Sequence, residues 1–454
     1  MEKTKELRNE NKMGTMPMTK LILTMSLPAI FSMTIQAMYN IVDSIFIGQW
    51  NQDGLTATSY AYPLQMLLIA VAVGTAIGVN SLISRKLGEK SYKEANDVAT
   101  HGLFLCVVSY IFFLVIGLFA VKPFMCAYTD DQEIVDFGVQ YLSIVLCFSL
   151  FSIVQVMLEK TLQATGNMIY PMICQLIGAV VNIICDPILI FGYGIFPEMG
   201  ISGAAIATVF GQFCGMLFAL MIVFFKKHDV KISFKNFKIN FSSIKNIYAV
   251  GFPSIIMQSI GSVMIIGLNA ILTASQAAVT VLGVYYKLQS FVFMPCFGLN
   301  QGVMPIIGYN YGARNGKRMY SALKRGIFIA VIIMTIGTVL MWAIPEILLS
   351  MFGGTKELME IGVPALRIIS LCFIPAAAGI MFTTLFQATG KGIRSLIMSF
   401  CRQLVLILPI AFVLSNLFGI TSVWYAFPIA EYIALALAIG FFINLTKGDF
   451  KKLS

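Results

Sequence analysis

The stretch ATSYAYPLQMLLIAVAVGTAIGVNSLIS, residues 57–84, contains no Asp, Glu, Lys or Arg. An α-helix of about 20 apolar residues crosses the hydrocarbon core of a bilayer, so this stretch predicts a membrane-spanning helix. The whole chain of 454 residues has the same character, since 58% of its residues are apolar and only 11% are charged. Its mean hydropathy is +0.85. This composition excludes an ordinary soluble domain and leaves no room for a large soluble catalytic domain.

Further stretches of this length and composition follow one another along the chain, separated by charged residues or by clusters of Gly and Pro. Together they predict an all-α integral membrane protein with twelve transmembrane helices. The predicted spans lie near residues 24–48, 57–84, 98–121, 137–158, 168–191, 201–225, 246–273, 278–308, 323–345, 361–386, 394–416 and 421–445.

The net charge of +10 comes from 31 Lys and Arg residues against 21 Asp and Glu residues. Most of the Lys and Arg residues lie in the two tails or in loops that follow even-numbered spans, whereas the opposite loops hold Lys122 and Lys356. Because basic residues favour the cytoplasmic side, this asymmetry predicts that both tails are cytoplasmic. It also explains the basic charge without nucleic acid, so we expect no nucleic-acid partner.

A repeat at an offset of 224 residues relates the two halves of the chain. Gly74 and Gly78 align with Gly298 and Gly302, and Gln-Ala-Thr-Gly occurs at both 163–166 and 387–390. Each half holds an even number of spans, so the two six-helix lobes point the same way and are related by a pseudo-two-fold axis along the membrane normal. The predicted parts are an N-terminal tail at 1–23, an N-lobe at 24–225, a linker at 226–245, a C-lobe at 246–445 and a C-terminal tail at 446–454.

The residue types that metal or nucleotide chemistry needs are scarce. The nine cysteines are scattered singly, mostly inside apolar runs, and the two histidines are His101 and His228. The sequence therefore offers neither a zinc site nor a phosphate-binding loop with its Lys-Ser/Thr ending. A nucleophile with its base is not recognisable either. We expect no cofactor and no enzymatic activity.

Two carboxylates are expected inside the N-lobe at matching depth, near the outer ends of the first and fifth spans. They belong to Asp43 and Asp186. An ionised group at mid-membrane costs about 2.5–3.5 kcal/mol on insertion scales, and two nearby carboxylates cannot both stay ionised cheaply. The pair therefore predicts a site that holds a proton or a cation. In the alternative, structural role, Asp43 braces the backbone and Asp186 begins a turn before Pro187.

Other polar residues are expected near this pair. Three precede Asp43 at spacings that put them on its face of the helix, and one asparagine lies a turn before Asp186. A threonine in the sixth span lies about 10 Å below the outer surface. The predicted cation-coupling residues are Asp43, Asn182, Asp186 and Thr208, and the supporting polar stripe is Gln36, Tyr39 and Asn40.

Charged residues are also expected within the second half. Lys287 and Glu431 lie at nearly equal depth in the eighth and twelfth spans. We predict that they form a buried pair, which either holds the lobe together or contacts substrate. Arg367 and Arg402 lie nearer the span ends and are expected to extend toward the membrane surface. The ionisable residues 159 and 160, at the edge of the fourth span, are expected to be solvated.

Several motifs along the chain are typical of one family of transporters. They are Leu27-Pro28, Val42-Asp43-Ser44-Ile45-Phe46-Ile47-Gly48, the two Gln-Ala-Thr-Gly sequences, and Asn182-x-x-x-Asp186-Pro187. Together they resemble the multidrug and toxic compound extrusion (MATE) family, and the resemblance covers nearly the whole chain. Residues 286–290 through Met294-Pro295, and then residues 308–313, are similar to the MepA-like bacterial branch of that family.

The resemblance implies a V-shaped, two-lobed antiporter in the bacterial cytoplasmic membrane. It would export cationic, amphipathic drugs in exchange for H⁺ or Na⁺, act as a monomer, and have the lipid bilayer as its other partner. Asp43 takes the place of the family's essential first-helix aspartate, with Asn182, Asp186 and Thr208 as its cation-site partners. Asp43 and Asp186 would be metal ligands only if Na⁺ is the coupling ion. Gly261 stands where some members have a glutamate, which favours coupling through the N-lobe.

Two other kinds of transporter are alternatives to this interpretation. A major facilitator has six plus six parallel helices, but it expects an acidic-basic signature between the second and third spans, where this chain reads Arg85-Lys86-Leu87-Gly88-Glu89-Lys90. A flippase for lipid-linked substrates would share the fold, and the sequence does not separate it from a drug exporter.

Overall fold

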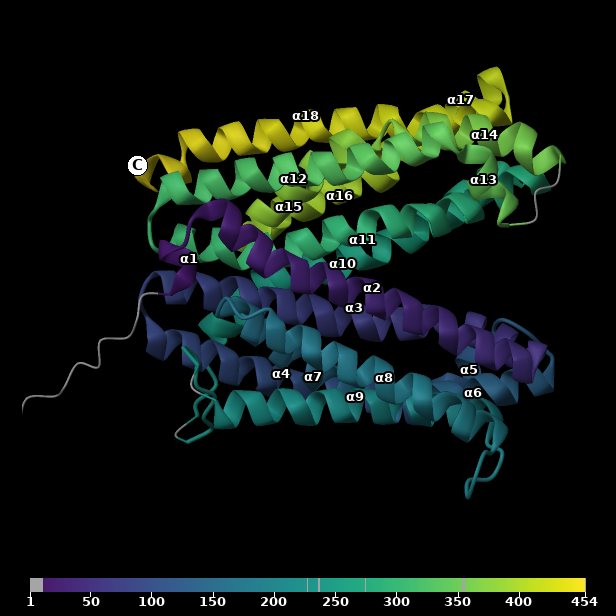
Figure 1. Cartoon of the computed structure of the whole chain (residues 1–454), viewed down its shortest axis with the longest axis horizontal. Coiled ribbons are helices and arrows are strands. Elements are labelled where there is room, and N and C mark those ends of the chain that lie inside the picture. Colours follow the sequence, from purple (N-terminus) through teal and green to yellow (C-terminus); the bar gives the residue numbers. More distant parts are fainter. Residues whose placement is uncertain (1–10, 227, 236, 274, 353–355, 454) are drawn as a thin grey trace, which may run out of the picture.

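The computed structural model describes residues 11–226, 228–235, 237–273, 275–352 and 356–453, without the side chains of residues 40 and 452 (Figure 1). These residues are helical almost throughout and include no strand. The helices of the first half are α1 (Lys12–Thr15), α2 (Met18–Trp50), α3 (Gln52–Gly88), α4 (Tyr92–Phe119), α5 (Val121–Cys126), α6 (Gln132–Cys147), α7 (Leu150–Ala164), α8 (Ile169–Phe191) and α9 (Gly200–Phe225).

The second half repeats this order. Its helices are α10 (Phe241–Leu272), α11 (Gln276–Gly312), α12 (Gly316–Ala343), α13 (Pro345–Ser350), α14 (Lys356–Ser370), α15 (Phe373–Ala388), α16 (Gly392–Phe400), the π-helix η1 (Cys401–Ile407), α17 (Leu408–Phe418), the 3₁₀ helix η2 (Ile420–Tyr425), α18 (Ala426–Lys447) and the 3₁₀ helix η3 (Asp449–Leu453).

The number of membrane spans is as predicted. Within the described residues, ten helical segments are long and apolar enough to cross a membrane, and two bent helix pairs bring the number to twelve. The bent pairs are α6 with α7, at 47°, and α14 with α15, at 46°. These pairs are the fourth span of each half, so the repeat extends to the position of the bend.

The two halves form two lobes. In Figure 1 the purple-to-teal helices α4 to α9 lie on one side and the green-to-yellow helices α12 to α18 on the other, with α2, α3, α10 and α11 between them. Short helix α1 and the C-terminal end lie at the same end of the molecule, here called the terminal side. The ribbons of the lobes diverge toward the opposite end. The predicted fold class, twelve helices in two parallel lobes, is confirmed.

Glycines on the long helices let the lobes approach closely, and they do so reciprocally. A Cβ on Gly74 of α3 would lie 2.5 Å from Ile255 of α10, and a Cβ on Gly298 of α11 would lie 2.6 Å from the Cα of Ile30 of α2. Gly74 and Gly298 are repeat partners, and so are Ile30 and Ile255. Each lobe therefore inserts the same part of its second span against the first span of the other lobe, which is the contact pattern of a pseudo-two-fold axis.

Candidate functional site

The carboxyl groups of Asp43 on α2 and Asp186 on α8 approach each other closely enough to hydrogen-bond. Asp186 is fully buried. Asn182 Nδ2, one turn earlier on α8, donates to Asp186 Oδ1 at 3.3 Å and to Thr208 Oγ1 of α9 at 3.4 Å. The structure thus brings together all four residues predicted for the cation-coupling set.

Three oxygens of this cluster are buried without a hydrogen-bond donor among the described residues. They are Asp43 Oδ1, Asp186 Oδ2 and Asn182 Oδ1. An ionised carboxylate only accepts hydrogen bonds, so a bond between two carboxyl groups needs a proton on one of them. Without that proton, the two negative charges need a cation to stay together in a low-dielectric site. The chemistry available to this cluster is therefore the binding and release of a proton or a small cation.

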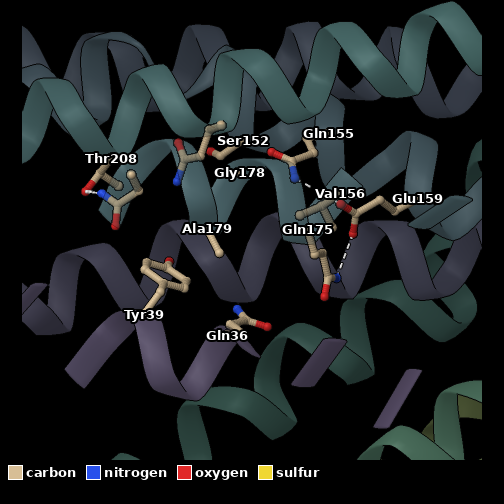
Figure 2. A pocket seen from close by; sticks show the side chains of 12 residues that line it. Gln36, Tyr39, Ser152, Gln155, Val156, Glu159, Gln175, Gly178, Ala179 and Thr208 are labelled. Carbon is tan, nitrogen blue, oxygen red and sulfur yellow. Dashed lines mark hydrogen bonds between the residues drawn. The ribbon is translucent and has the colours of Figure 1, made fainter. Parts of the chain in front are cut away.

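The polar stripe on α2 is placed partly as predicted. Tyr39 is close enough to Asp43 and Asp186 for its hydroxyl to interact with their charges, and Gln36 lies about one turn before Tyr39 on the same helix. Both side chains line the cavity described below (Figure 2). The side chain of Asn40 lies outside the described part of the structure.

One residue near the carboxyl pair was missed by the sequence reasoning. Tyr141 of α6 is 4% exposed, lies within electrostatic reach of Asp43 and Asp186, and hydrogen-bonds Gln65 of α3. Its spacing from Gly138 places it on the buried face of α6, which the sequence does indicate. What that face touches depends on how α6 packs, and no motif marks it.

A cavity of about 120 Å³ adjoins this cluster inside the N-lobe (Figure 2). Most of its lining is polar but uncharged, and its one carboxylate is that of Glu159. The lining residues are Gln36, Tyr39, Ser152, Gln155, Val156, Glu159, Gln175, Gly178, Ala179, Asn182, Thr208 and Gln212.

The expectation that Glu159 and Lys160 are solvated is wrong. Glu159 is 3% exposed and accepts hydrogen bonds from Gln155 Nε2 at 3.0 Å and Gln175 Nε2 at 2.8 Å (Figure 2). Lys160 Nζ donates to Gln301 of α11 at 2.8 Å, across the lobe interface. The reason is length: α7 runs to Ala164 rather than ending at residue 158, so both residues lie inside the helix.

The predicted pair of Lys287 and Glu431 is also wrong for the residues that the structure describes. Glu431 of α18 pairs with Arg402 of η1, with Nη1 to Oε1 at 3.0 Å, and both side chains are largely covered. Arg402 therefore does not extend to the membrane surface. Lys287 instead lies over the ring of Phe352, 5.7 Å from its centroid. Arg367, 3.6 Å from Glu346, does lie at a half-exposed position.

No group of three or more His, Cys, Asp and Glu side chains that is suited to a metal ion occurs in the described residues. The carboxyl pair offers two acidic oxygen donors, with the neutral oxygens of Asn182 and Thr208 beside them.

The fold and this N-lobe cluster define a membrane transporter with duplicated lobes, and the comparisons agree. The MatE family model matches residues 28–188 and 250–413, one segment in each lobe. The chain belongs to the MatE family, whose members are transporters and not enzymes. The major facilitator alternative is thereby excluded.

Curated relatives of the chain match over nearly their full length. It is 28% identical to multidrug export protein MepA of Staphylococcus haemolyticus over 424 residues, 92% of each chain. It is 27% identical to MepA of Staphylococcus saprophyticus over 417 residues, 91% of each chain. These relatives are bacterial.

Solved structures show the same fold. An outward-facing multidrug resistance transporter of the MATE family superposes with a TM-score of 0.90 at 24% identity, covering 100% of both chains. A transporter of the MOP superfamily from Pyrococcus furiosus superposes with a TM-score of 0.90 at 23% identity, covering 100% of this chain and 99% of that one. At these identities the likeness concerns the fold.

Proposed function

We propose that this protein exports cationic, amphipathic drugs in exchange for H⁺ or Na⁺, coupled through Asp43 and Asp186. The observation that carries the proposal is the contact between these two carboxyl groups, with buried, unpaired oxygens beside a polar cavity. The relatives named multidrug export protein support drugs as the substrate, and the resemblance of the motifs to the MATE family suggests cationic, amphipathic ones.

Coupling follows from two contacts that α2 makes at different points along its length. Asp43 lies in the cluster, whereas Ile30 of the same helix packs against Gly298 of the other lobe, about 20 Å away along the helix axis at 1.5 Å per residue. Loading or emptying Asp43 changes the charge that α2 must accommodate in the N-lobe. If the loaded and empty forms favour different positions of α2, the packing between the lobes changes with them. Drug and ion then exchange because each stabilises a different state.

The charge of the cavity suits cations. The carboxylate of Glu159 lines the cavity, and the side chains that hydrogen-bond it there are two neutral amides. The buried carboxylate of Glu431 in the C-lobe is instead paired with the cation of Arg402. Drug-sized ligands occupy pockets of roughly 300–1,000 Å³, which exceeds the 120 Å³ seen here. The cavity therefore admits part of a drug in this conformation and enlarges in another.

The orientation belongs to the same proposal. We infer that both termini lie in the bacterial cytoplasm, with the terminal side of the molecule facing inward; the Lys and Arg distribution and the bacterial relatives support this orientation. The N-lobe comprises residues 24–225 and the C-lobe residues 246–445, joined by the linker at 226–245. The transporter works as a monomer in the lipid bilayer, because each chain holds both lobes.

Ethidium efflux from energised cells tests this function. Cells that carry the wild-type protein, Asp43→Asn or the control Asp53→Asn are compared at equal expression, with a pH gradient or a sodium gradient imposed separately. Asp53 is an exposed carboxylate at the start of α3, so the control makes the same chemical change outside the cluster. Efflux driven by one gradient and lost only in Asp43→Asn supports the proposal and identifies the ion. Equal efflux by all three proteins refutes the role of Asp43, and no dye movement with either gradient favours the lipid-linked substrate instead.

A further inference from the structure

Two grooves on the terminal side are related by the repeat. The C-lobe groove, of about 570 Å³, is lined by Ala249, Gly390, Lys391, Gly392, Ile393, Arg394, Ile397, Phe441 and Asn444. The N-lobe groove, of about 310 Å³, is lined by Asn11, Lys12, Thr24, Thr165, Gly166, Asn167, Met168, Ile169, His228 and Asp229. Thr24 corresponds to Ala249, and residues 166–169 correspond to residues 390–393. The duplication therefore created the same hollow twice.

The segment before α1 forms part of the wall of the N-lobe groove. Asn11 Nδ2, just before α1, donates to Asp229 Oδ2 at 2.8 Å and to the carbonyl oxygen of Thr165 at 3.0 Å. Lys12 lines the same groove and brings a cation near the Asp229 carboxylate. The N-lobe groove therefore has part of its wall built by the segment before α1, and its lining contains a carboxylate as well as a cation.

The C-lobe groove has a cation without such a balance. Arg394 donates from Nη1 to the carbonyl oxygen of Phe441 and from Nη2 to Asn444 Oδ1, both at 3.1 Å. Both acceptors are neutral, and no carboxylate pairs with Arg394 among the described residues, whereas Lys391 pairs with Asp449 at 2.5 Å. A guanidinium has five N–H donors, so three remain beyond these two bonds.

The rest of the groove is apolar and faces outward. Ile393 is 63% exposed and Ile397 42% exposed, and the ring of Phe441 lies under the guanidinium, 5.9 Å from Arg394 Cζ. The groove lies where α16 begins and α18 nears its end, so a membrane-spanning chain has its bilayer boundary here. A cation with spare donors beside exposed aliphatic side chains matches a molecule with an anionic head and a hydrocarbon tail.

We propose that the C-lobe groove binds one acidic phospholipid. Its phosphate accepts hydrogen bonds from the guanidinium of Arg394, in the planar geometry that arginine offers to phosphate. Its acyl chain lies along Ile393 and Ile397. At about 570 Å³ the groove is far larger than a free phosphate needs. This inference depends on the membrane placement of the family and not on drug export, so it stands or fails separately from the proposed function.

Native mass spectrometry of the delipidated protein in detergent tests the site. The wild type is titrated with phosphatidylglycerol or, separately, with phosphatidylcholine, and the first binding constant is compared with those of three variants. Arg394→Gln removes the guanidinium, Ile393→Asp puts a negative charge into the groove at an exposed position, and Lys324→Gln removes an exposed charge from α12 as the control.

The wild type is expected to prefer phosphatidylglycerol. Arg394→Gln should weaken its binding about tenfold, the size of one charge-assisted contact, and Lys324→Gln should leave it unchanged. Ile393→Asp should weaken it as well, and this variant decides the matter if Arg394→Gln is not monodisperse. Phosphatidylglycerol binding that is equal in Arg394→Gln, Ile393→Asp and the control overturns the proposal. So does complete displacement of the lipid by an equal concentration of glycerol 3-phosphate, because the site would then recognise a free phosphate.

Discussion

Lys160 of α7 donates a hydrogen bond to Gln301 of α11 at 2.8 Å and so joins the N-lobe to the C-lobe. Gln163, one turn later, donates to the same Gln301 oxygen at 3.3 Å. These bonds belong to the terminal-side contact between the lobes, together with the reciprocal glycines. A state that opens on the terminal side must therefore break the bonds from Lys160 and Gln163 to Gln301.

Lys160→Met should make opening on the terminal side easier. A hydrogen bond from a charged donor contributes about 1.5–3 kcal/mol, so its loss shifts the balance between the two states by about tenfold or more. Spin labels at Lys93 and Lys317, exposed repeat partners at the starts of α4 and α12, report the distance between the lobes. Double electron–electron resonance should show a larger long-distance population in Lys160→Met. Lys86→Met, which removes ion pairs within the N-lobe, is the control, and an equal distribution in both variants would contradict the role of Lys160.

Gly298→Ala should destabilise the packed lobe interface. The added Cβ would lie 2.6 Å from the Cα of Ile30 and 2.7 Å from its backbone nitrogen, so the backbone of α2 must move. Such overpacking costs about 1–3 kcal/mol, more than the gain of up to about 1 kcal/mol from replacing a helical glycine. Gly283→Ala on the same helix has nothing within 4 Å of its Cβ and serves as the control. Thermal unfolding in detergent measures both, and a midpoint of Gly298→Ala no lower than that of Gly283→Ala would count against the close contact.

Glu159→Gln should impair the export of cations while preserving the fold. Gln155 and Gln175 each donate to one Glu159 oxygen, and an amide in that place offers only one oxygen, so one donor is left unpaired at a cost of about 1–3 kcal/mol. Loss of the carboxylate also removes the charge that attracts a cationic drug. The concentration of ethidium at half-maximal transport should rise about tenfold. Glu133→Gln, at an exposed position on α6, should leave it unchanged, and an unchanged value in both variants would exclude substrate contact at Glu159.

Arg402→Gln should strongly destabilise the C-lobe. Glu431 is only 7% exposed, and the substitution removes the cation that pairs with its carboxylate. Breaking a buried ion pair in this way lowers the free energy of unfolding by about 3–5 kcal/mol. Arg367→Gln breaks a half-exposed pair and should cost less than about 1 kcal/mol. The double variant Arg402→Met with Glu431→Leu should recover most of the lost stability, because no buried charge remains. An unfolding temperature that is lower for Arg367→Gln than for Arg402→Gln would contradict the assignment of Arg402 and Glu431 as a buried ion pair.

The spans and the repeat were predictable because both depend on composition and spacing along one chain. The composition of a stretch such as residues 57–84 predicts a membrane span without any knowledge of packing. Gly74 and Gly298 are separated by the offset of the repeat, which also does not depend on how the helices pack. The two carboxylates were found for the same reason, since their depth follows from their distance to the ends of their spans.

The partners of buried charges were less predictable, because they depend on helix ends and on departures from the α-helical period. The chain continues as α7 past residue 158, which brings Glu159 into the interior and Lys160 to the lobe interface. Arg402 lies in a π-helix, whose wider turn changes the direction of its side chain relative to an ideal α-helix. Tyr141 approaches Asp43 only through the packing of α6. None of these features has a sequence signal strong enough to replace the structure.

The central claim is that Asp43 couples the movement of an ion to that of a drug. Liposomes that contain the purified protein, a pH-sensitive dye and an outward ethidium gradient measure this directly, with radioactive sodium uptake as the parallel assay for Na⁺. The account predicts that the ethidium gradient drives one of the two ions in the opposite direction in the wild type and in Asp53→Asn, and drives neither in Asp43→Asn. Ion movement of equal size in Asp43→Asn would contradict it.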